Sequence, residues 1–485
     1  MTHVPILRLG KSYESVEKVE ILQHATGEPI ARVSQANSGL IVRDIRRMDD
    51  AVLERFTVVE LIGLCRKAAE LFVTATLPLG DSPQSFDDYL AQLSATTGMP
   101  VAYGRANAEK IRRVLADMDV IIGGLTRGFD LAILDRGYGT NPEPRASARA
   151  DTPAPPMLSF FREGRIFGAV LPSNSPGVHG LWIPAIALKA PVVLKPGREE
   201  PWTPYRIIQS LIAAGVPREA FGFYPTDHAG AGELLRGVDR SMLFGDTNTT
   251  RPWRSDPRVE IHGPGFSKII LGDDAADDWE RHLDLMESSV AGNCGRSCIN
   301  ASGVWTPRNG RRIAEALAAR LAKVEALPAD DPRASIAAFA NPQTAERMSA
   351  IIDNDLRVAG AADLTQSLRG SPRLVTKGRC AYLLPTIVWC ESREHPLANR
   401  EFLFPFASVV ECPTDDIPEA IGPSLVVSAI TRDESLIRRL MASPNVDRLN
   451  IGAIPTYQLS WDQPHEGNLF EHLYRQRAFQ IESAA

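Results

Sequence analysis

The strongest constraint on the fold is a regular alternation of short apolar runs with helical patterns over residues 166–271. The apolar runs cover 166–171, 190–195, 221–224, 242–244, 259–261 and 268–271. Helical patterns separate the first four runs, at 180–188, 202–214 and 229–236. Short strands that alternate with helices of this length predict βαβ units around a parallel sheet.

The remainder of the chain predicts a second α/β unit and smaller parts around it. Helical and strand-like patterns alternate again from about 278 to 423, whereas residues 49–132 are mostly helical. Residues 136–155 are rich in Pro, Gly, Ser and Arg, which indicates an exposed connection or arm.

The composition argues against several classes of protein. The 485 residues are 44% apolar and 23% charged, which is typical of globular proteins. The formal net charge of -6 argues against a nucleic-acid binder with a basic face. The sequence has no apolar run long enough to cross a membrane and no apolar leader within residues 1–20. Its six unevenly spaced Cys favour reduced thiols and a cytoplasmic location.

Two thiols, Cys294 and Cys298, lie four residues apart in the sequence GNCGRSCIN. A metal site would need further His or Cys ligands, which are missing nearby, so we expect no metal. A redox pair and two buried structural thiols stay open as alternatives. If the segment begins a helix, however, the helix N-terminus lowers the pKa of a thiol, and a thiolate is a ready nucleophile for a carbonyl carbon.

Three further residues have chemistry that such a reaction needs. Asn174, in the loop PSNSP after a predicted strand, could donate to an oxyanion, although a lone Asn is usually a turn residue. Glu260, in a short apolar strand, could be a general base or a carboxylate that faces water at a sheet edge. Lys195 ends a predicted strand, where it could contact a ligand or extend into solvent. A GxGxxG dinucleotide motif is missing from the expected context.

Taken in order, these motifs resemble those of the aldehyde dehydrogenase superfamily. The segments that carry the resemblance are PSNSP at 172–176, VLKPG at 193–197, FGDT at 244–247, VEIHGPG at 259–265, GRSCINAS at 295–302 and REFLFP at 400–405. The similarity covers about residues 155–480 and is typical of a divergent branch.

The resemblance implies an α/β, aldehyde dehydrogenase-like fold with two Rossmann-like lobes, parallel-sheet cores and a small oligomerisation arm. The cofactor-binding domain would span 1–130 and 156–267, and the catalytic domain 268–445. The oligomerisation or bridging segments would be 131–155 and 446–485, with a C-terminal strand near 477–481 in the arm. The protein would then be a homodimer or homotetramer.

The resemblance also implies oxidation of a small-molecule aldehyde to a carboxylic acid with NADP or NAD, through a cysteine thiohemiacetal and thioester. Cys298 would be the nucleophile, Asn174 with the Cys298 backbone N–H would stabilise the oxyanion, and Glu260 would activate the hydrolytic water. The implied cofactor-binding residues are Pro172, Ser173, Lys195, Arg198, Gly245, Thr247, Glu401 and Leu403.

Departures from the family pattern bear on the cofactor and the substrate. Counting from Lys195, the family's ribose-binding Glu falls at Arg198, whose guanidinium suits a 2′-phosphate. We therefore predict a preference for NADP, unless Glu199 or Glu200 takes that role after a shift of register. Arg296 replaces a Gln before the nucleophile, and Ser173 replaces a Trp.

Two other functions stay open. An acyl-CoA reductase or CoA-acylating aldehyde dehydrogenase would use the same Cys; Glu260 favours water, whereas the helical region 49–123 keeps CoA chemistry open. A non-catalytic binding or structural member of the fold is the alternative from another class. Three aromatic residues are candidates for an apolar substrate tunnel or for the core: Trp182, Trp461 and Phe470.

Overall fold

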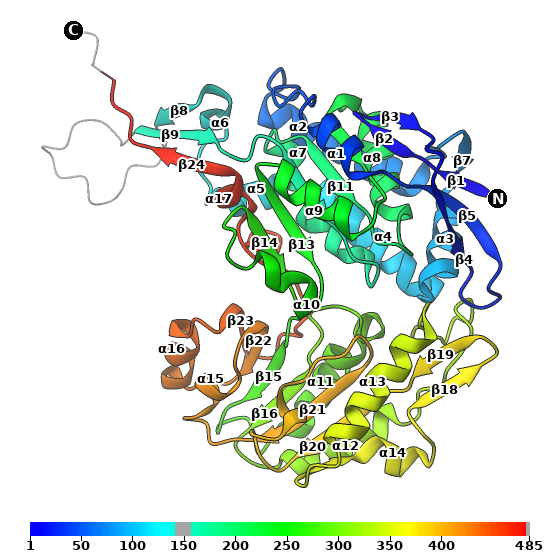
Figure 1. The fold of residues 1–485 in the computed structure, drawn as a ribbon. Helices are drawn as coiled ribbons and strands as arrows, with labels where there is room; N and C mark the ends of the chain where they lie inside the picture. Colours follow the sequence, from blue (N-terminus) through cyan, green and yellow to red (C-terminus); the bar gives the residue numbers. More distant parts are fainter. Residues whose placement is uncertain (141–156, 482–485) are drawn as a thin grey trace, which may run out of the picture.

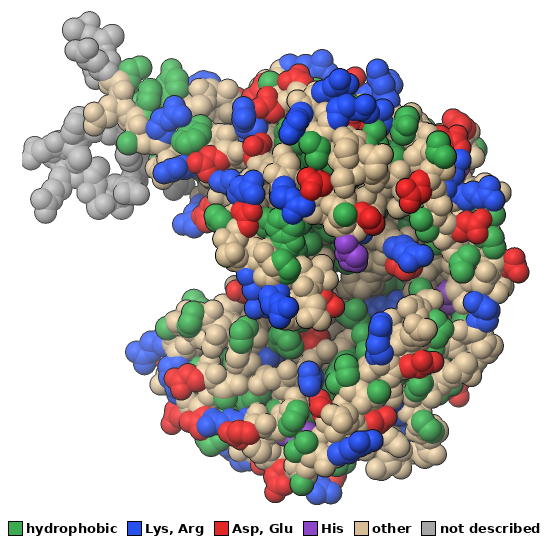
Figure 2. Space-filling view, in the orientation of Figure 1, with side chains coloured by type: hydrophobic (Ala, Val, Ile, Leu, Met, Phe, Trp, Pro, Cys, Tyr) green, Lys and Arg blue, Asp and Glu red, His purple; other side chains and the backbone are tan. Residues whose placement is uncertain are grey.

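The protein consists of two α/β lobes, one above the other in Figure 1, with a small arm that projects from the upper lobe. This computed structural model describes residues 1–140 and 157–481. Figure 2 shows that the surface is hollowed between the lobes. Within the described ranges, the helices are too short or too polar to cross a membrane.

The upper lobe is built on a seven-stranded sheet whose order is β14-β13-β10-β11-β12-β2-β3. Its five consecutive strands from β14 to β12 are parallel, and β2 and β3 join antiparallel at one edge. The strands are β2 (Ile6–Arg8), β3 (Lys11–Tyr13), β10 (Phe167–Val170), β11 (Val192–Lys195), β12 (Phe221–Phe223), β13 (Arg240–Phe244) and β14 (Val259–His262).

Helices cover both faces of this sheet, which explains why its central strands β10, β11 and β12 are almost entirely apolar. Along β11, Val192 and Leu194 pack into one hydrophobic core, and Val193 between them packs into another on the opposite face. Side chains alternate between faces along a strand, so a strand buried on both sides has no polar alternation. The first core includes α2 (Val58–Thr74), α4 (Val101–Ala116) and α8 (Trp202–Ala214); the second includes α1 (Ser38–Ile45) and α9 (His228–Gly237).

The N-terminal region adds parts that the sequence patterns show only weakly. A small sheet of order β1-β5-β4 packs beside the upper lobe, and a short hairpin interrupts the helical region. These elements, with the remaining helices here, are β1 (Thr2–Val4), β4 (Lys18–Leu22), β5 (Pro29–Ser34), β6 (Leu77–Leu79), β7 (Ser82–Gln84), α3 (Phe86–Thr97), α5 (Met118–Leu125) and α6 (Ala132–Arg136).

The lower lobe has its own seven-stranded sheet, of order β17-β20-β21-β16-β15-β22-β23. All its pairs are parallel except β17 with β20. The strands are β15 (Lys268–Leu271), β16 (Gly303–Thr306), β17 (Ala361–Asp363), β20 (Thr386–Cys390), β21 (Phe406–Glu411), β22 (Ser424–Ile430) and β23 (Val446–Ile451). Because β23 pairs with β22, the expected domain boundary at residue 445 falls just before a strand of this sheet.

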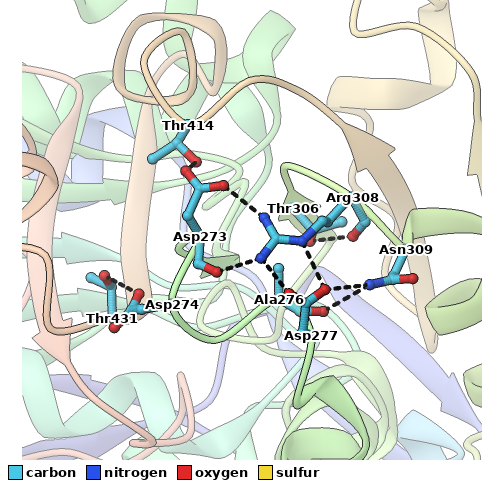
Figure 3. Close-up of polar contacts among 9 residues, drawn as sticks. All are labelled: Asp273, Asp274, Ala276, Asp277, Thr306, Arg308, Asn309, Thr414 and Thr431. Atoms are coloured by element: carbon cyan, nitrogen blue, oxygen red, sulfur yellow. Dashed lines mark hydrogen bonds and ion pairs between the residues drawn. The ribbon is translucent and has the colours of Figure 1, made fainter.

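Helices also flank the lower sheet, and a charged network ties three of its strand ends together. The helices include α11 (Leu283–Ala291), α12 (Gly310–Leu321), α13 (Pro342–Asp355), α14 (Leu364–Arg369) and α16 (Glu434–Ala442). Beyond the carboxyl ends of the strands, Arg308 pairs with Asp273 and Asp277, both at 2.7 Å, and Thr414 donates to Asp273 (Figure 3). These loops follow β16, β15 and β21, so the network lies at one edge of the sheet.

The arm is a three-stranded antiparallel sheet of order β24-β9-β8. Its strands are β8 (Tyr138–Thr140), β9 (Met157–Arg162) and β24 (Tyr474–Arg477). The C-terminal strand therefore lies before the expected 477–481. Most of the expected arm segment, 141–156, lies outside the described residues. Three aromatic rings pack against one another at the base of the arm, with centroids 5.0–5.4 Å apart: Phe129, Phe160 and Phe470.

Candidate active site

The candidate site lies where the carboxyl edge of the upper sheet meets the amino edge of the lower sheet. Asn174 follows β10, Lys195 ends β11 and His262 ends β14. Cys298 precedes β16, and Glu401 precedes β21. Ligands bind at the carboxyl ends of parallel strands, so the upper sheet points its binding loops at the residues that the lower sheet presents.

The Cys298 loop differs from the expected start of a helix. After α11 ends at Ala291, Gly292–Gly295 form a single 3-10 turn in which Asn293 and Cys294 have φ of 50° and 60°. The Asn293 amide holds this turn, since it donates to Ser175 Oγ at 3.0 Å and to Ser297 Oγ at 2.7 Å. The proposed lowering of a thiol pKa by a helix N-terminus is therefore wrong, because no helix begins here.

The two thiols have different surroundings. Cys294 is buried, and burial raises its pKa to about 12. Cys298 lines a cavity between the lobes, together with apolar side chains and Glu466. Burial and the negative charges of Glu466 and Glu401 raise the Cys298 pKa, which the Lys110 charge opposes. The resting Cys298 is therefore a protonated thiol that needs a proton acceptor to become a nucleophile.

Glu466 is placed to be that acceptor. The Cys298 Sγ donates to Glu466 Oε1 over 3.2 Å. Two imidazoles hold the carboxylate, with His262 Nδ1 2.8 Å from Oε2 and His465 Nε2 3.2 Å from Oε1. Burial raises the Glu466 pKa, but the hydrogen bonds and charges of these histidines outweigh it and lower the pKa well below its usual value.

His262 links Glu466 to Glu260. Its Nδ1 faces Glu466, and its Nε2 lies 3.6 Å from Glu260 Oε1. The ring stacks on Phe244, with centroids 4.5 Å apart. Burial lowers the His262 pKa, but the two carboxylates outweigh it and raise the pKa overall. Burial also raises the Glu260 pKa, so Glu260 is a stronger base than an exposed carboxylate.

Asn174 lies beside the Cys298 loop. Its Nδ2 donates to the backbone oxygen of Arg296 over 2.8 Å, two residues before the thiol. Arg296 itself is buried and donates to the oxygens of Thr97, at 2.9 Å, and Ala338, at 2.6 Å. Arg296 thus ties the Cys298 loop to both lobes, which is a structural role for this departure from the family pattern.

Glu401 lies behind the same loop. Its carboxylate accepts from the backbone N–H of Gly265, over 3.2 Å, and of Phe266. Burial raises the Glu401 pKa to about 7, and burial lowers the pKa of nearby Lys268 to about 7. The role of Glu401 at the nicotinamide ribose stays a prediction, as does that of half-buried Leu403.

Two of the predicted cofactor residues of the upper lobe, Lys195 and Arg198, line a separate cavity at the ends of β11 and β12. Its walls come from 195–198, Pro201, 225–228 and the small sheet beside it. A side chain at Gly197 would clash with Ser173 Oγ and the Pro172 oxygen, so a glycine lets these two loops pack together. Burial lowers the Lys195 pKa, and the negative charges of Glu199 and Asp227 partly offset this by raising it. This cationic, partly apolar cavity fits the adenosine end of a dinucleotide.

The turn after β13 is compact. Gly245 packs against Thr249, and Asp246 accepts from the Thr249 N–H over 2.8 Å, which begins α10 (Thr247–Thr250). The predicted residues Gly245 and Thr247 are therefore placed at the carboxyl edge of the upper sheet, beside His262, whose oxygen bonds the Gly245 N–H over 3.2 Å.

Several residues of the site are ones that sequence reasoning missed. Glu466 lies in the polar stretch 461–468, whose unusual composition was the available signal. A side chain at Gly467, which has φ of +93°, would clash with the Glu260 carboxylate, so a glycine is favoured directly after Glu466. Of the three candidate tunnel aromatics, Trp461 lines the cavity, whereas Trp182 and Phe470 are core residues. Among the described residues, no group of three or more His, Cys, Asp and Glu is arranged to hold a metal.

Comparison with known proteins identifies the class. The profile of the aldehyde dehydrogenase family matches residues 166–423. Aminoacetaldehyde dehydrogenase of Pseudomonas aeruginosa is 28% identical over 273 residues, which are 53% of this chain and 52% of that protein; the match thus spans about half of that relative's length. 3,6-Anhydro-L-galactose dehydrogenase in complex with NAP superposes with a TM-score of 0.76 at 14% identity, covering 98% of this chain and 99% of that one.

A second solved structure agrees in fold. The NAD+ complex of aldehyde dehydrogenase from Bacillus cereus has a TM-score of 0.75 at 15% identity, covering 99% of this chain and 97% of that one. The chain belongs to the aldehyde dehydrogenase family, whose enzymes use NAD or NADP. The expected fold class and family are confirmed.

Proposed function

We propose that the protein oxidises an aldehyde to a carboxylic acid with NADP or NAD, through a covalent bond to Cys298. The observation that carries this proposal is the thiol of Cys298, which lines the cavity between the lobes and donates to the buried carboxylate of Glu466. A nucleophile within hydrogen-bond reach of a base that a third group orients is the arrangement of covalent catalysis. Here His262 orients Glu466.

In the mechanism, the Cys298 sulfur bonds to the aldehyde carbon while Glu466 takes the thiol proton. Because its lowered pKa makes Glu466 a weak base, the proton moves only as the new carbon–sulfur bond makes the thiol more acidic. Asn174 Nδ2 and the Cys298 N–H stabilise the resulting oxyanion, an effect worth several kcal/mol in other acyl-transfer enzymes. The dinucleotide, when bound, accepts a hydride, and the residues that would hold it are those at Lys195, Gly245 and Glu401. Glu260, with its raised pKa, then takes a proton from the water that hydrolyses the thioester.

The test of this function separates water from CoA as the acceptor of the acyl group. Turnover should release the free acid without added CoA, and added CoA should leave the rate and the product unchanged. In Glu260→Gln, kcat should fall by roughly 10²–10⁴, because general-base catalysis contributes about that much. Product released only when CoA is present, as acyl-CoA, would identify the CoA-linked alternative instead.

The non-catalytic alternative predicts an inert thiol. Iodoacetamide should label Cys298 in the folded protein and abolish turnover, and Cys294 should stay unlabelled because it is buried. Retained NAD(P)H formation after labelling of Cys298 would contradict the covalent mechanism.

Preference for NADP rests on Arg198. Its side chain is exposed at the cavity that holds Lys195, where it makes no ion pair with another described residue, whereas the charge of Glu199 acts on Lys195. A guanidinium binds a phosphate in bidentate fashion, so NADP should bind with the lower Kd and Arg198→Glu should reverse the order. Tighter binding of NAD to the unaltered protein would assign the ribose contact to Glu199.

A further inference from the structure

Lys110 is the cation of the substrate cavity. It lies on α4. Its side chain packs against the loop that follows Asn174, since a Cβ added at Gly177 would lie 3.5 Å from Lys110 Nζ. Lys110 lines both the inner cavity that contains Cys298 and an adjoining outer cavity. The two cavities also share four other lining residues: Ser297, Ile299, Leu459 and Trp461. Lys110 therefore stands along the path from the outer cavity to the thiol.

The ammonium of Lys110 has no partner of its own. Among the hydrogen bonds and ion pairs of the described residues, none includes Lys110, although burial lowers its pKa and the charges of Cys298 and Glu466 act on it. Glu466 lies beyond ion-pair distance of Lys110 and is already held by His262 and His465. The side chain is half-buried, and an ammonium that is partly withdrawn from water without a counter-charge is costly, so this position favours a ligand that brings one.

The rest of the inner cavity is mostly apolar. The charged or titratable residues that line it are Lys110, Cys298, His465 and Glu466, and Glu466 contacts both Cys298 and His465. The apolar residues that line the same cavity are Ile121, Leu125, Val178, Leu181, Met242, Ile299, Leu459 and Trp461. A ligand here would have an apolar chain against this wall and one anionic end at Lys110.

We propose that the substrate is an aldehyde whose carbon chain ends in an anionic group, such as a carboxylate, and that Lys110 binds this group while the carbonyl reaches Cys298. This inference rests on the proposed function and adds the class of substrate. Lys110 is then a specificity-determining residue. Arg113 also lines the outer cavity, where Glu109 pairs with it over 3.6 Å, so among the described residues Lys110 is the unpaired cation along this path.

The test compares aldehydes of equal chain length with and without the anionic end. Succinic, glutaric and adipic semialdehyde are measured against butanal, pentanal and hexanal. At the best chain length, kcat/KM should favour the semialdehyde by about 10- to 100-fold, the usual range for a hydrogen bond to a charged group. Lys110→Met should remove this preference mainly through KM, and Lys110→Arg should restore part of it. Lys67→Met, at an exposed position on α2, is the matched control and should keep it.

A binding measurement does not depend on turnover. Glutarate should slow the alkylation of Cys298 by iodoacetamide in the unaltered protein more than pentane-1,5-diol does, and Lys110→Met should abolish the difference. Equal protection by the diacid and the diol, or a preference that survives in Lys110→Met, would overturn the proposal about Lys110. Glutarate protection without NAD(P)H formation from any aldehyde would support Lys110 binding and contradict the proposed oxidation.

Discussion

At the residue scale, the thiol of Cys298 faces a carboxylate from a distant part of the chain. The amide of Glu466→Gln has the size of the carboxylate but cannot take the thiol proton. We expect kcat/KM to fall by roughly 10²–10⁴, the range for a lost general base. Glu471→Gln removes an exposed carboxylate five residues away and is the control. An unchanged or higher kcat/KM in Glu466→Gln would show that Glu466 only suppresses thiolate formation through its charge.

The pair of His262 and Glu466 makes a prediction about pH. The His262 pKa is raised, so its stabilisation is fully present below the unfolded value of about 6.5 and is lost as pH rises through the folded value. The Glu466 pKa is lowered, so its stabilisation is present above the unfolded value of about 4.3 and is lost as pH falls through the folded value.

His262→Gln should therefore reduce the free energy of unfolding by about 1–3 kcal/mol at pH 6 and by less at pH 9. Urea unfolding at the two pH values measures this difference, with His228→Gln, at the exposed start of α9, as the control. A loss of stability that is the same at both pH values would mean that His262 contributes by stacking on Phe244 and not by charge.

At the scale of elements, a buried arginine joins α8 to the end of α2 and to the β6–β7 hairpin. Arg206 donates to the backbone oxygens of Phe72 at 2.8 Å, Ala75 at 2.7 Å and Gln84 at 3.0 Å. Arg206→Met leaves three buried oxygens without donors, so the free energy of unfolding should fall by about 3–5 kcal/mol.

Denaturant unfolding of Arg206→Met measures this loss, and Arg105→Met is the matched control. Arg105 also pairs with the segment that begins α3, through Asp87, but it is exposed, and exposed pairs contribute about 0–1 kcal/mol. If both variants lose the same small amount, the oxygens around Arg206 must find other donors.

Secondary structure was predictable where one periodicity governs a whole element. The predicted helix at 202–214 and the strand at 190–195 correspond to α8 and β11, because both are buried on faces that the apolar pattern shows. The hairpin β6–β7 within a helical region was missed. Short elements at an edge bury few side chains, and so have little apolar pattern for a sequence to show.

At the scale of the whole molecule, the arm presents an edge strand. Among residues 1–140 and 157–481, β24 pairs with β9 on one side only, and Arg475, Gln476 and Arg477 are exposed. Unpaired strand edges pair readily with another chain. We therefore predict a homodimer or homotetramer in which the arm takes part. A chain that ends at residue 473 should have the lower mass by light scattering while it keeps its Kd for the dinucleotide, and an unchanged mass would place the interface elsewhere.

From the sequence alone one can derive the α/β class and name Cys298, Asn174 and Glu260 as candidates, since each lies in a local motif. Only the tertiary structure shows that Glu466, His262 and Lys110 share a site with Cys298, because these residues meet only where the edges of the two sheets face each other. It also reverses the expected thiol pKa. The local sequence suggested a helix N-terminus that would lower it, whereas burial and the carboxylates of distant segments raise it. Electrostatic effects depend on distance in space, and that distance is set by packing.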